Sequence, residues 1–470
     1  MKKLKIFVSL LLAVSLIVSL SGCSFRFSSF DNLLRPPKLS GKYQGLQDSF
    51  EKSVDKEYSL IAPENGAFRS AFTTYDFDND GDEEAIVFYT EKKNPDLVKV
   101  FYFEYKNNDW HTVGTFDGLG SSVDEVKLAD LDHDGKSEII IGWTLYSSKT
   151  NKIFAVYNIS NENFELMSSF PYSYMTVFDV NGDGIEDIFA MSVDSTVADH
   201  LTACATVYNY DAKTKAMQTL SSVKTDGNIS SYSAVNTEKI DDIRLIYVDA
   251  YKGDSDMITE VIYWDDSTNS LVAPLFDFAT QSTILTLRHT KLATQDIDSD
   301  GFLEIPVSVE MPGSSVVDND NVLLAAAAAA NSADGTDNVP SKSLYYTKWV
   351  KFRDDKLRSV KYSVIDEKSG YILTIPSSWV GRLTVLGNDG QWDYYRWENG
   401  EQKVGDLLFS ISYYDKNDEQ AKAKHMDTKL LTSYASTVYV YTISEAGYDF
   451  GIKDETLKEN FNTTALGGKK

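Results

Sequence analysis

Four short stretches of the chain carry acidic side chains at a fixed spacing that suits a metal ion. They begin at Asp76 (DFDNDGDEE), Asp130 (DLDHDGKSE), Asp179 (DVNGDGIED) and Asp296 (DIDSDGFLE), and we name them loops 1 to 4. In each loop, positions 1, 3 and 5 carry a side-chain oxygen, position 6 is glycine and position 9 is acidic. Calcium takes about six to eight oxygen ligands in flexible geometry. The spacing therefore predicts up to four structural Ca²⁺ ions.

Each loop offers five candidate ligands, at positions 1, 3, 5, 7 and 9. Position 7 varies freely, as expected if it binds through its backbone carbonyl. The candidates are Asp76, Asp78, Asp80, Asp82 and Glu84 in loop 1; Asp130, Asp132, Asp134, Lys136 and Glu138 in loop 2; Asp179, Asn181, Asp183, Ile185 and Asp187 in loop 3; and Asp296, Asp298, Asp300, Phe302 and Glu304 in loop 4.

An EF-hand loop and an acidic turn without an ion are the two alternatives to this kind of calcium loop. An EF-hand needs a glutamate at position 12 at the start of a helix, but position 12 is Val87, Ile141, Ala190 or Val307, and strand-like runs follow. The loops could also be acidic turns without an ion, because Asp, Asn and Gly favour turns. The return of acid at position 9 in every copy favours calcium.

The loops recur at a regular pitch. Their starts lie 54, 49 and 117 residues apart, and the last gap is about twice the others. A unit without an acidic loop is therefore expected near residue 237, in NTEKIDDIRLIYVDAY. Four strand-like runs in each unit of about 50 residues are typical of a propeller blade. We predict a mainly β fold, a β-propeller of about five four-stranded blades followed by a small α+β domain.

These repeats resemble the FG-GAP, or VCBS-type, repeats of integrin α-like β-propellers, whose blades carry a DxDxDGxxD loop between their first two strands. The resemblance covers about residues 68 to 310, with an extension to 365. It implies that the residues at the loop positions above are calcium ligands. The sequence departs from the family in the unit near residue 237, which has no acidic loop, and in lacking the FG and GAP words themselves.

The start of the chain has the features of a secretory signal. Three lysines precede an apolar run from Ile6 to Leu20, and LSGC follows, ending at Cys23. LSGC resembles the bacterial lipobox, which implies cleavage after residue 22, lipidation of Cys23 and a lipid-anchored protein on the outer face of the bacterial cytoplasmic membrane. A plain signal peptide with a chance cysteine is the alternative.

The remaining chain divides into three parts. We expect a tether and short helix at 23–66, the propeller at 67–366 with a low-complexity insertion at 314–343, and the α+β domain at 367–470. We expect the segment YSLIAP, from Tyr58, to supply a strand that closes the propeller ring. Removing residues 1–22 takes away three lysines, so the formal net charge changes from −25 to −28, which disfavours nucleic acid as a partner.

The sequence favours binding over catalysis. None of the five histidines lies in an HExxH motif, and no GxSxG motif occurs. We therefore expect an adhesion or scaffold module for an unidentified protein or glycan. The alternative is a cell-envelope enzyme or carbohydrate-binding protein that uses the propeller cleft or the C-terminal domain. Aromatic residues in strands of this kind more often pack in a core than form a platform for a ligand. In the C-terminal domain these residues are Trp379, Trp392, Tyr394, Tyr395 and Trp397.

Overall fold

The fold is known from a computed structural model that describes most of the chain. The described residues are 41–54, 57–145, 151–160, 163–194, 202–241, 243–313, 345–366, 369–388, 390–401 and 403–463. The predicted signal peptide, the lipidation site Cys23 and the insertion 314–343 lie outside the described residues.

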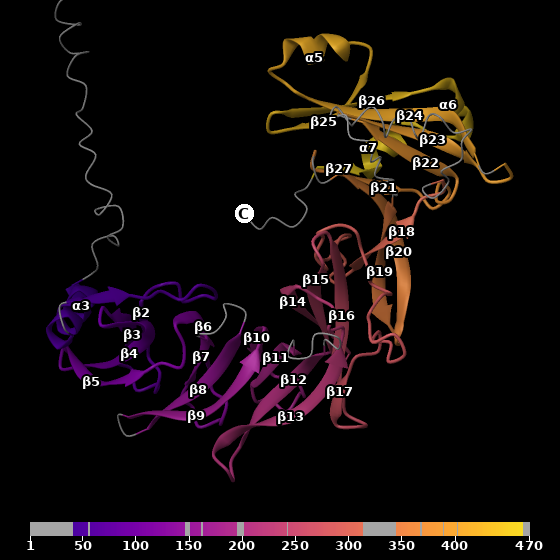
Figure 1. Cartoon of the computed structure of the whole chain (residues 1–470). Coiled ribbons are helices and arrows are strands. Elements are labelled where there is room, and N and C mark those ends of the chain that lie inside the picture. The colour runs from indigo at the N-terminus through magenta and orange to yellow at the C-terminus, as the bar shows by residue number, and fades with distance from the viewer. Residues whose placement is uncertain are drawn as a thin grey trace, which may run out of the picture.

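Five antiparallel sheets follow one another along the chain, and we name them blades 1 to 5 (Figure 1). Blade 1 contains β1 (Tyr58–Leu60), β2 (Phe72–Tyr75), β3 (Glu84–Glu91), β4 (Asn94–Lys106) and β5 (Asp109–Asp117). Blade 2 contains β6 (Ser122–Ala129), β7 (Glu138–Thr144), β8 (Lys152–Ser160) and β9 (Asn163–Tyr172). Blade 3 contains β10 (Tyr174–Phe178), β11 (Asp187–Asp194), β12 (Thr202–Asp211) and β13 (Ala216–Thr225).

The last two blades follow the same order. Blade 4 contains β14 (Ser231–Ile240), β15 (Ile243–Lys252), β16 (Asp256–Asp265) and β17 (Ser270–Val272). Blade 5 contains β18 (Ile305–Glu310), β19 (Tyr345–Arg353), β20 (Lys356–Asp366), β21 (Tyr371–Ile375) and β27 (Phe461–Asn462). The prediction of a mainly β fold built from four-stranded, blade-like sheets is confirmed. The unit expected near residue 237 is blade 4, where a tight turn joins β14 to β15.

Consecutive blades stack face to face. Because successive side chains of a strand point to opposite faces, β3 turns Phe88 towards Trp143 of blade 2 and Val87 the other way. Further apolar clusters join blade 2 to 3, blade 3 to 4 and blade 4 to 5. Each inner blade thus buries both of its faces.

Other elements cover the outer faces of the two end blades. The helix α3 (Gly41–Ser53) lies on blade 1, where the ring of Phe50 contacts the rings of Phe72 and Phe101. Tyr346 and Val364 of blade 5 pack into a cluster shared with the C-terminal sheet. In the described part of the chain the blades therefore form an open row, with α3 at one end and the C-terminal region at the other (Figure 1).

The expectation that YSLIAP closes a ring is wrong. Its strand β1 pairs antiparallel with β3 of blade 1, with Tyr58 opposite Glu91. The outer face of blade 1, on which a closing blade would pack, is covered by α3 instead. Strand β1 therefore extends the sheet of blade 1 and does not join blade 5 to it.

The C-terminal region is one sheet with short helices, as the sequence predicts. Its strands are β22 (Leu383–Asn388), β23 (Gln391–Glu398), β24 (Lys403–Asp415), β25 (Lys429–Tyr434) and β26 (Thr437–Ile443). Its helices are α5 (Glu419–Lys424), α6 (Glu445–Phe450) and α7 (Asp454–Asn460). Strand β27 pairs with β21, so this region also completes the sheet of blade 5. The domain boundary at residue 367 stays a prediction.

The aromatic residues of the C-terminal region lie mainly in its core. Trp379, Tyr394 and Trp397 are buried. Trp392 is half-buried and donates its indole N–H to Asp366 Oδ2 at 2.9 Å, and Tyr395 is half-buried. These side chains pack the sheet rather than form a flat, exposed platform.

None of the helices in the described residues has the length and apolar character needed to cross a membrane.

Replacement of Phe50 by alanine tests how α3 covers blade 1. Phe50 is fully buried among four aromatic rings, so Phe50→Ala should lower the free energy of unfolding by about 3 to 5 kcal/mol. The control is Phe278→Ala, because this side chain is 65% exposed and its loss should change stability by about 0.5 kcal/mol or less. Equal effects in denaturant titrations would show that α3 does not cover the sheet.

Candidate metal centres

The four acidic loops lie at corresponding places in four blades. Loop 1 connects β2 to β3 in blade 1, loop 2 connects β6 to β7 in blade 2, and loop 3 connects β10 to β11 in blade 3. Loop 4 leads into β18 of blade 5, and an antiparallel bridge between Gln295 and Glu304 closes its base. The hairpin position that the sequence predicts for loops 1 to 3 therefore agrees with the strand order.

The first carboxylate of each loop organises the turn. Asp76 accepts hydrogen bonds from the backbone N–H groups of Asp80 at 3.1 Å and Gly81 at 3.0 Å. Gly81 has a φ of 96°, a conformation that other residues rarely adopt. Asp130 and Asp296 make the same pair of bonds, and Asp179 accepts from Gly182 and Gly184. Four loops of different sequence thus share one fold.

The acid at position 9 is buried in all four loops. It accepts a hydrogen bond from the backbone N–H of position 2, which fixes one carboxylate oxygen and leaves the other for a further partner. The bonds are Phe77 N to Glu84 at 2.8 Å, Leu131 N to Glu138 at 2.8 Å, Val180 N to Asp187 at 3.1 Å and Ile297 N to Glu304 at 2.8 Å. None of the four acids is more than 4% exposed.

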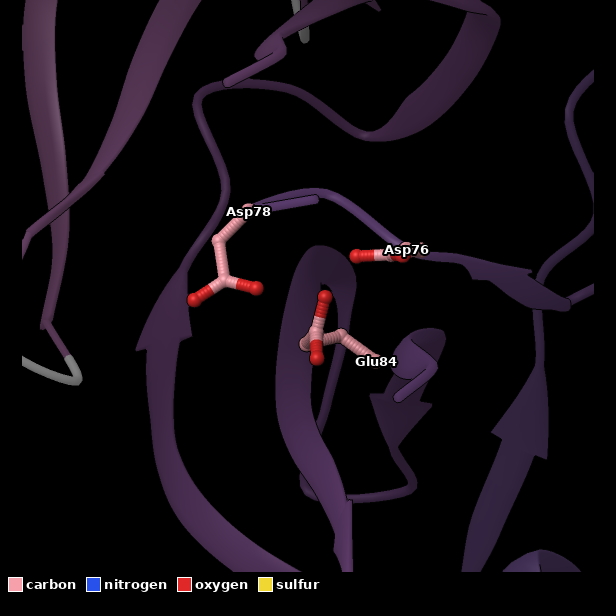
Figure 2. A group of neighbouring side chains, drawn as sticks. All are labelled: Asp76, Asp78 and Glu84. Carbon is pink, nitrogen blue, oxygen red and sulfur yellow. The ribbon is translucent and has the colours of Figure 1, made fainter. Parts of the chain in front are cut away.

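Three acidic clusters could hold a metal ion. They consist of Asp76, Asp78 and Glu84; Asp130, Asp132 and Glu138; and Asp296, Asp298 and Asp300, and in each cluster the ligand oxygens lie within 4.8 Å of one another. In loop 1 the three carboxylates point towards one another from the two sides of the turn (Figure 2). Loop 3 has an amide at position 3, and Asn181 Nδ2 donates to Asp183 Oδ2 at 2.9 Å.

The remaining predicted ligands surround these clusters. The position 5 carboxylates accept the backbone N–H of position 7 at 2.9 to 3.1 Å. The side chains at position 7 are unrelated, and those of Asp82, Lys136 and Phe302 are exposed, whereas Ile185 is half-buried. Only the backbone of position 7 is shared between loops, which agrees with a ligand role for its carbonyl alone.

The electrostatics of loops 1 to 3 favour a bound cation. Burial, together with the neighbouring carboxylates, raises the pKa of Glu84 and of Glu138 to about 7 and that of Asp187 to about 6. Asp78 Oδ1 is buried and has no hydrogen-bond partner among the described residues. An all-oxygen donor set with clustered carboxylates fits Ca²⁺, because a divalent ion would neutralise the charge and complete the partners of these oxygens.

Loop 4 differs because a lysine that the sequence analysis missed reaches it. Lys351 of β19 contacts Asp300 Oδ2, and its Nζ lies 3.0 Å from Glu304 Oε1 and 4.0 Å from Asp298 Oδ2. The lysine is 47 residues after Glu304 in the sequence, beyond the insertion. Only the strand pairing, in which Ile305 lies opposite Val350, shows that the two residues meet.

Blade 4, which has no acidic loop, contains a different charged group that the sequence did not reveal. Asp249 and Arg288 are both fully buried and form an ion pair at 2.7 Å. Asp249 Oδ1 also accepts the hydroxyl hydrogen bonds of Thr259 at 2.7 Å and Thr294 at 2.9 Å. A buried acid of this blade is thus neutralised by a side chain of the segment after β17, where Arg288 forms a backbone bridge with Met257 of β16.

Comparisons with known proteins leave the family open. No family model matches the chain, and no curated protein matches it. Among solved structures, the chain is similar to a crystal structure of a protein from Lactobacillus plantarum, with 10% identity and a TM-score of 0.28, over 73% of this chain and 86% of that one. The fold and the loops described above make this chain a mainly β protein of stacked, blade-like sheets with acidic loops.

The stability of the metal-free protein should fall as the pH rises. Between pH 4.5, the ordinary pKa of a glutamate, and about 7, the folded state holds more protons on Glu84 and Glu138 than the unfolded state does. Stability is therefore highest below this window and is lost through it. Thermal melts of the metal-free protein across this range should show a decreasing midpoint, and Ca²⁺ should oppose the decrease.

Two isosteric variants distinguish the effect of a loop acid on stability from the effect of a buried acid outside the loops. Glu138→Gln should flatten the pH dependence and also weaken the response to Ca²⁺. Glu260, which lies outside the loops, also has its pKa raised to about 7 by burial, so Glu260→Gln should flatten the pH dependence without affecting the response to Ca²⁺. A Ca²⁺ response that is the same in both variants would contradict the assignment of Glu138 to a metal centre.

Proposed function

We propose that this chain is a lipid-anchored, extracytoplasmic binding protein whose blades are stabilised by calcium. The observation that carries the proposal is the repetition of one loop geometry, in which a buried acid at position 9 faces a turn organised by a second carboxylate. In loops 1 to 3 this acid has a backbone N–H partner but no ion-pair partner among the described residues, and an ionised carboxylate is costly to bury without a neutralising charge.

The resemblance to FG-GAP and VCBS-type repeats supports the same conclusion. In that family the DxDxDGxxD loop joins the first two strands of a blade; loops 2 and 3 have this position here, and loop 1 joins β2 to β3, after the additional strand β1. We assign structural calcium to loops 1 to 3 and consider loop 4 separately below. The row is open rather than a closed ring, so the likeness applies to the blades and their loops.

The N-terminal sequence supports a place outside the cytoplasmic membrane. The basic start, the apolar run and the lipobox-like LSGC at Cys23 agree with export and lipidation. Millimolar calcium is available to extracytoplasmic proteins, which matches the affinity of about 10⁻⁴ to 10⁻³ M typical of extracellular calcium modules. The formal charge of −28 for the processed chain makes nucleic acid an unfavourable partner.

A role in binding is better supported than a role in catalysis. In the described residues, the groups of three carboxylates whose oxygens lie within 4.8 Å of one another belong to the repeated loops, where their number and spacing fit a cation. The C-terminal aromatic residues, which could have formed a sugar platform, are buried or half-buried in their own sheet. We propose an adhesion or scaffold module that presents its blades to a protein or glycan.

Calcium should raise the melting temperature of the processed chain. The protein for this test comprises residues 23–470 with Cys23→Ser, which removes the lipid and keeps every loop. At millimolar Ca²⁺ each occupied site contributes roughly 0.4 to 1.4 kcal/mol, so three sites should raise the midpoint by several degrees. Mg²⁺ is the control, because it demands stricter geometry and dehydrates reluctantly. Equal midpoints in Ca²⁺ and in chelator would leave the loops as plain turns.

Substitution of the lipobox cysteine tests the location. In a bacterial host that exports the protein, the wild-type chain should be found with the membrane fraction, and Cys23→Ser should release it or leave it with its signal peptide uncleaved. A serine substitution at Cys204, which is outside the signal region, is the matched control and should leave the protein in the membrane fraction. Wild-type protein in the soluble fraction would refute the anchor.

A further inference from the structure

Loop 4 has the acidic spacing of the other loops but a different set of neighbours. Lys351 Nζ contacts Asp300 Oδ2, lies 3.0 Å from Glu304 Oε1 and lies within 4.0 Å of Asp298. The lysine side chain is only 15% exposed, so this ammonium group is held within the loop rather than in solvent. Its three carboxylate neighbours are those at positions 3, 5 and 9.

The strand pairing explains why only this blade places a cation there. Val350 pairs with Ile305, so the next residue along β19, Lys351, lies opposite the position 9 acid Glu304. In blade 1 the residue opposite the position 9 acid Glu84 is Glu104. In blades 2 and 3 the registers continue to an asparagine opposite the acid, at Asn158 and Asn209.

An aromatic ring and a second cation lie next to the lysine. Arg353, two residues along the same face of β19, pairs with Glu238 of blade 4 at 2.8 Å. The ring of Phe302, at position 7 of loop 4, lies 5.5 Å from Lys351 Nζ and 4.7 Å from the Arg353 guanidinium carbon. Cations over an aromatic face are attracted to it. The variable position 7 of this loop therefore carries a residue that suits neighbouring cations.

From this geometry we infer that the ammonium group of Lys351 takes the place of the calcium ion in loop 4. The lysine neutralises Asp300 and Glu304 through atoms that a metal ion would use as ligands. A Ca²⁺ ion in the same loop would lie beside a fixed positive charge at close range and would compete with it for these oxygens. Blade 5 is thus stabilised without metal, and the wild-type chain binds no calcium at loop 4.

This inference rests on the proposed calcium binding by the other loops, and the number of bound ions tests it. Equilibrium dialysis at millimolar free Ca²⁺ should give one more ion per molecule for Lys351→Met than for the wild type. Lys351→Arg keeps the charge and should leave the number unchanged. Lys99→Met is the matched control, because Lys99 Nζ lies 3.3 Å from Glu91 and 3.5 Å from Asp117, two carboxylates outside the four loops. An unchanged number in Lys351→Met, or a gain in Lys99→Met, would overturn the inference.

A second pair of variants decides the matter if Lys351→Met fails to fold. Asp296 and Asp130 hold the same position in loops 4 and 2, and asparagine at either site keeps the size of the side chain and one oxygen that can accept a turn hydrogen bond. Asp296→Asn should leave the number of bound ions unchanged, whereas Asp130→Asn should lower it by one. Loss of an ion from Asp296→Asn would show that loop 4 binds calcium beside its lysine and would overturn the inference. If the wild type binds no ion and Lys351→Met binds one, the inference stands and calcium binding by loops 1 to 3 fails.

Discussion

The stacking of sheets that are apolar on both faces is the constraint on which the whole structure depends. Every residue of β7 is buried, so this strand has no face that could meet water. A sheet of this kind is stable only between two neighbours, and each blade supplies a neighbour for the next. The two ends of the row then need covers of another kind, which α3 and the C-terminal sheet provide.

The stacking also determines the chemistry of the loops. The position 9 acid is the first residue of a buried strand in loops 1 to 3, so the packing of the blades takes it out of water together with the strand. Burial raises its pKa, and the neighbouring carboxylates raise it further. The buried negative charge that a cation could neutralise is therefore a consequence of where the strand begins. The acidic turn and the apolar strand, which look contradictory in sequence, form one unit.

The sequence predicted the features that are local or repeated. The regular spacing of the loops predicted where the blades lie. The unit without an acidic loop near residue 237 is blade 4, and its apolar strand was enough to predict it. The end covers were not predictable in the same way. Leu46 and Phe50 mark an apolar side of α3, but nothing local shows that this side packs on blade 1. Likewise, Lys351 meets loop 4 only through a strand register set on the far side of a long insertion.

The blades differ in what neutralises their buried acids, and the difference follows the chain. In blades 1 to 3 the position 9 acid lies opposite a residue without positive charge, so the protein supplies no cation opposite this acid. Blade 4 has no acidic loop, and its Asp249 pairs with Arg288 of the segment after β17, whereas blade 5 brings Lys351 into its loop. Removal of one partner of such an ion pair leaves the other as an uncompensated buried charge. The occupancy of a site for an external ion instead depends on the concentration of that ion. With calcium in loops 1 to 3, as proposed above, the stability of the first three blades follows the calcium concentration around the protein, whereas the acids of loop 4 have Lys351 as their counterion.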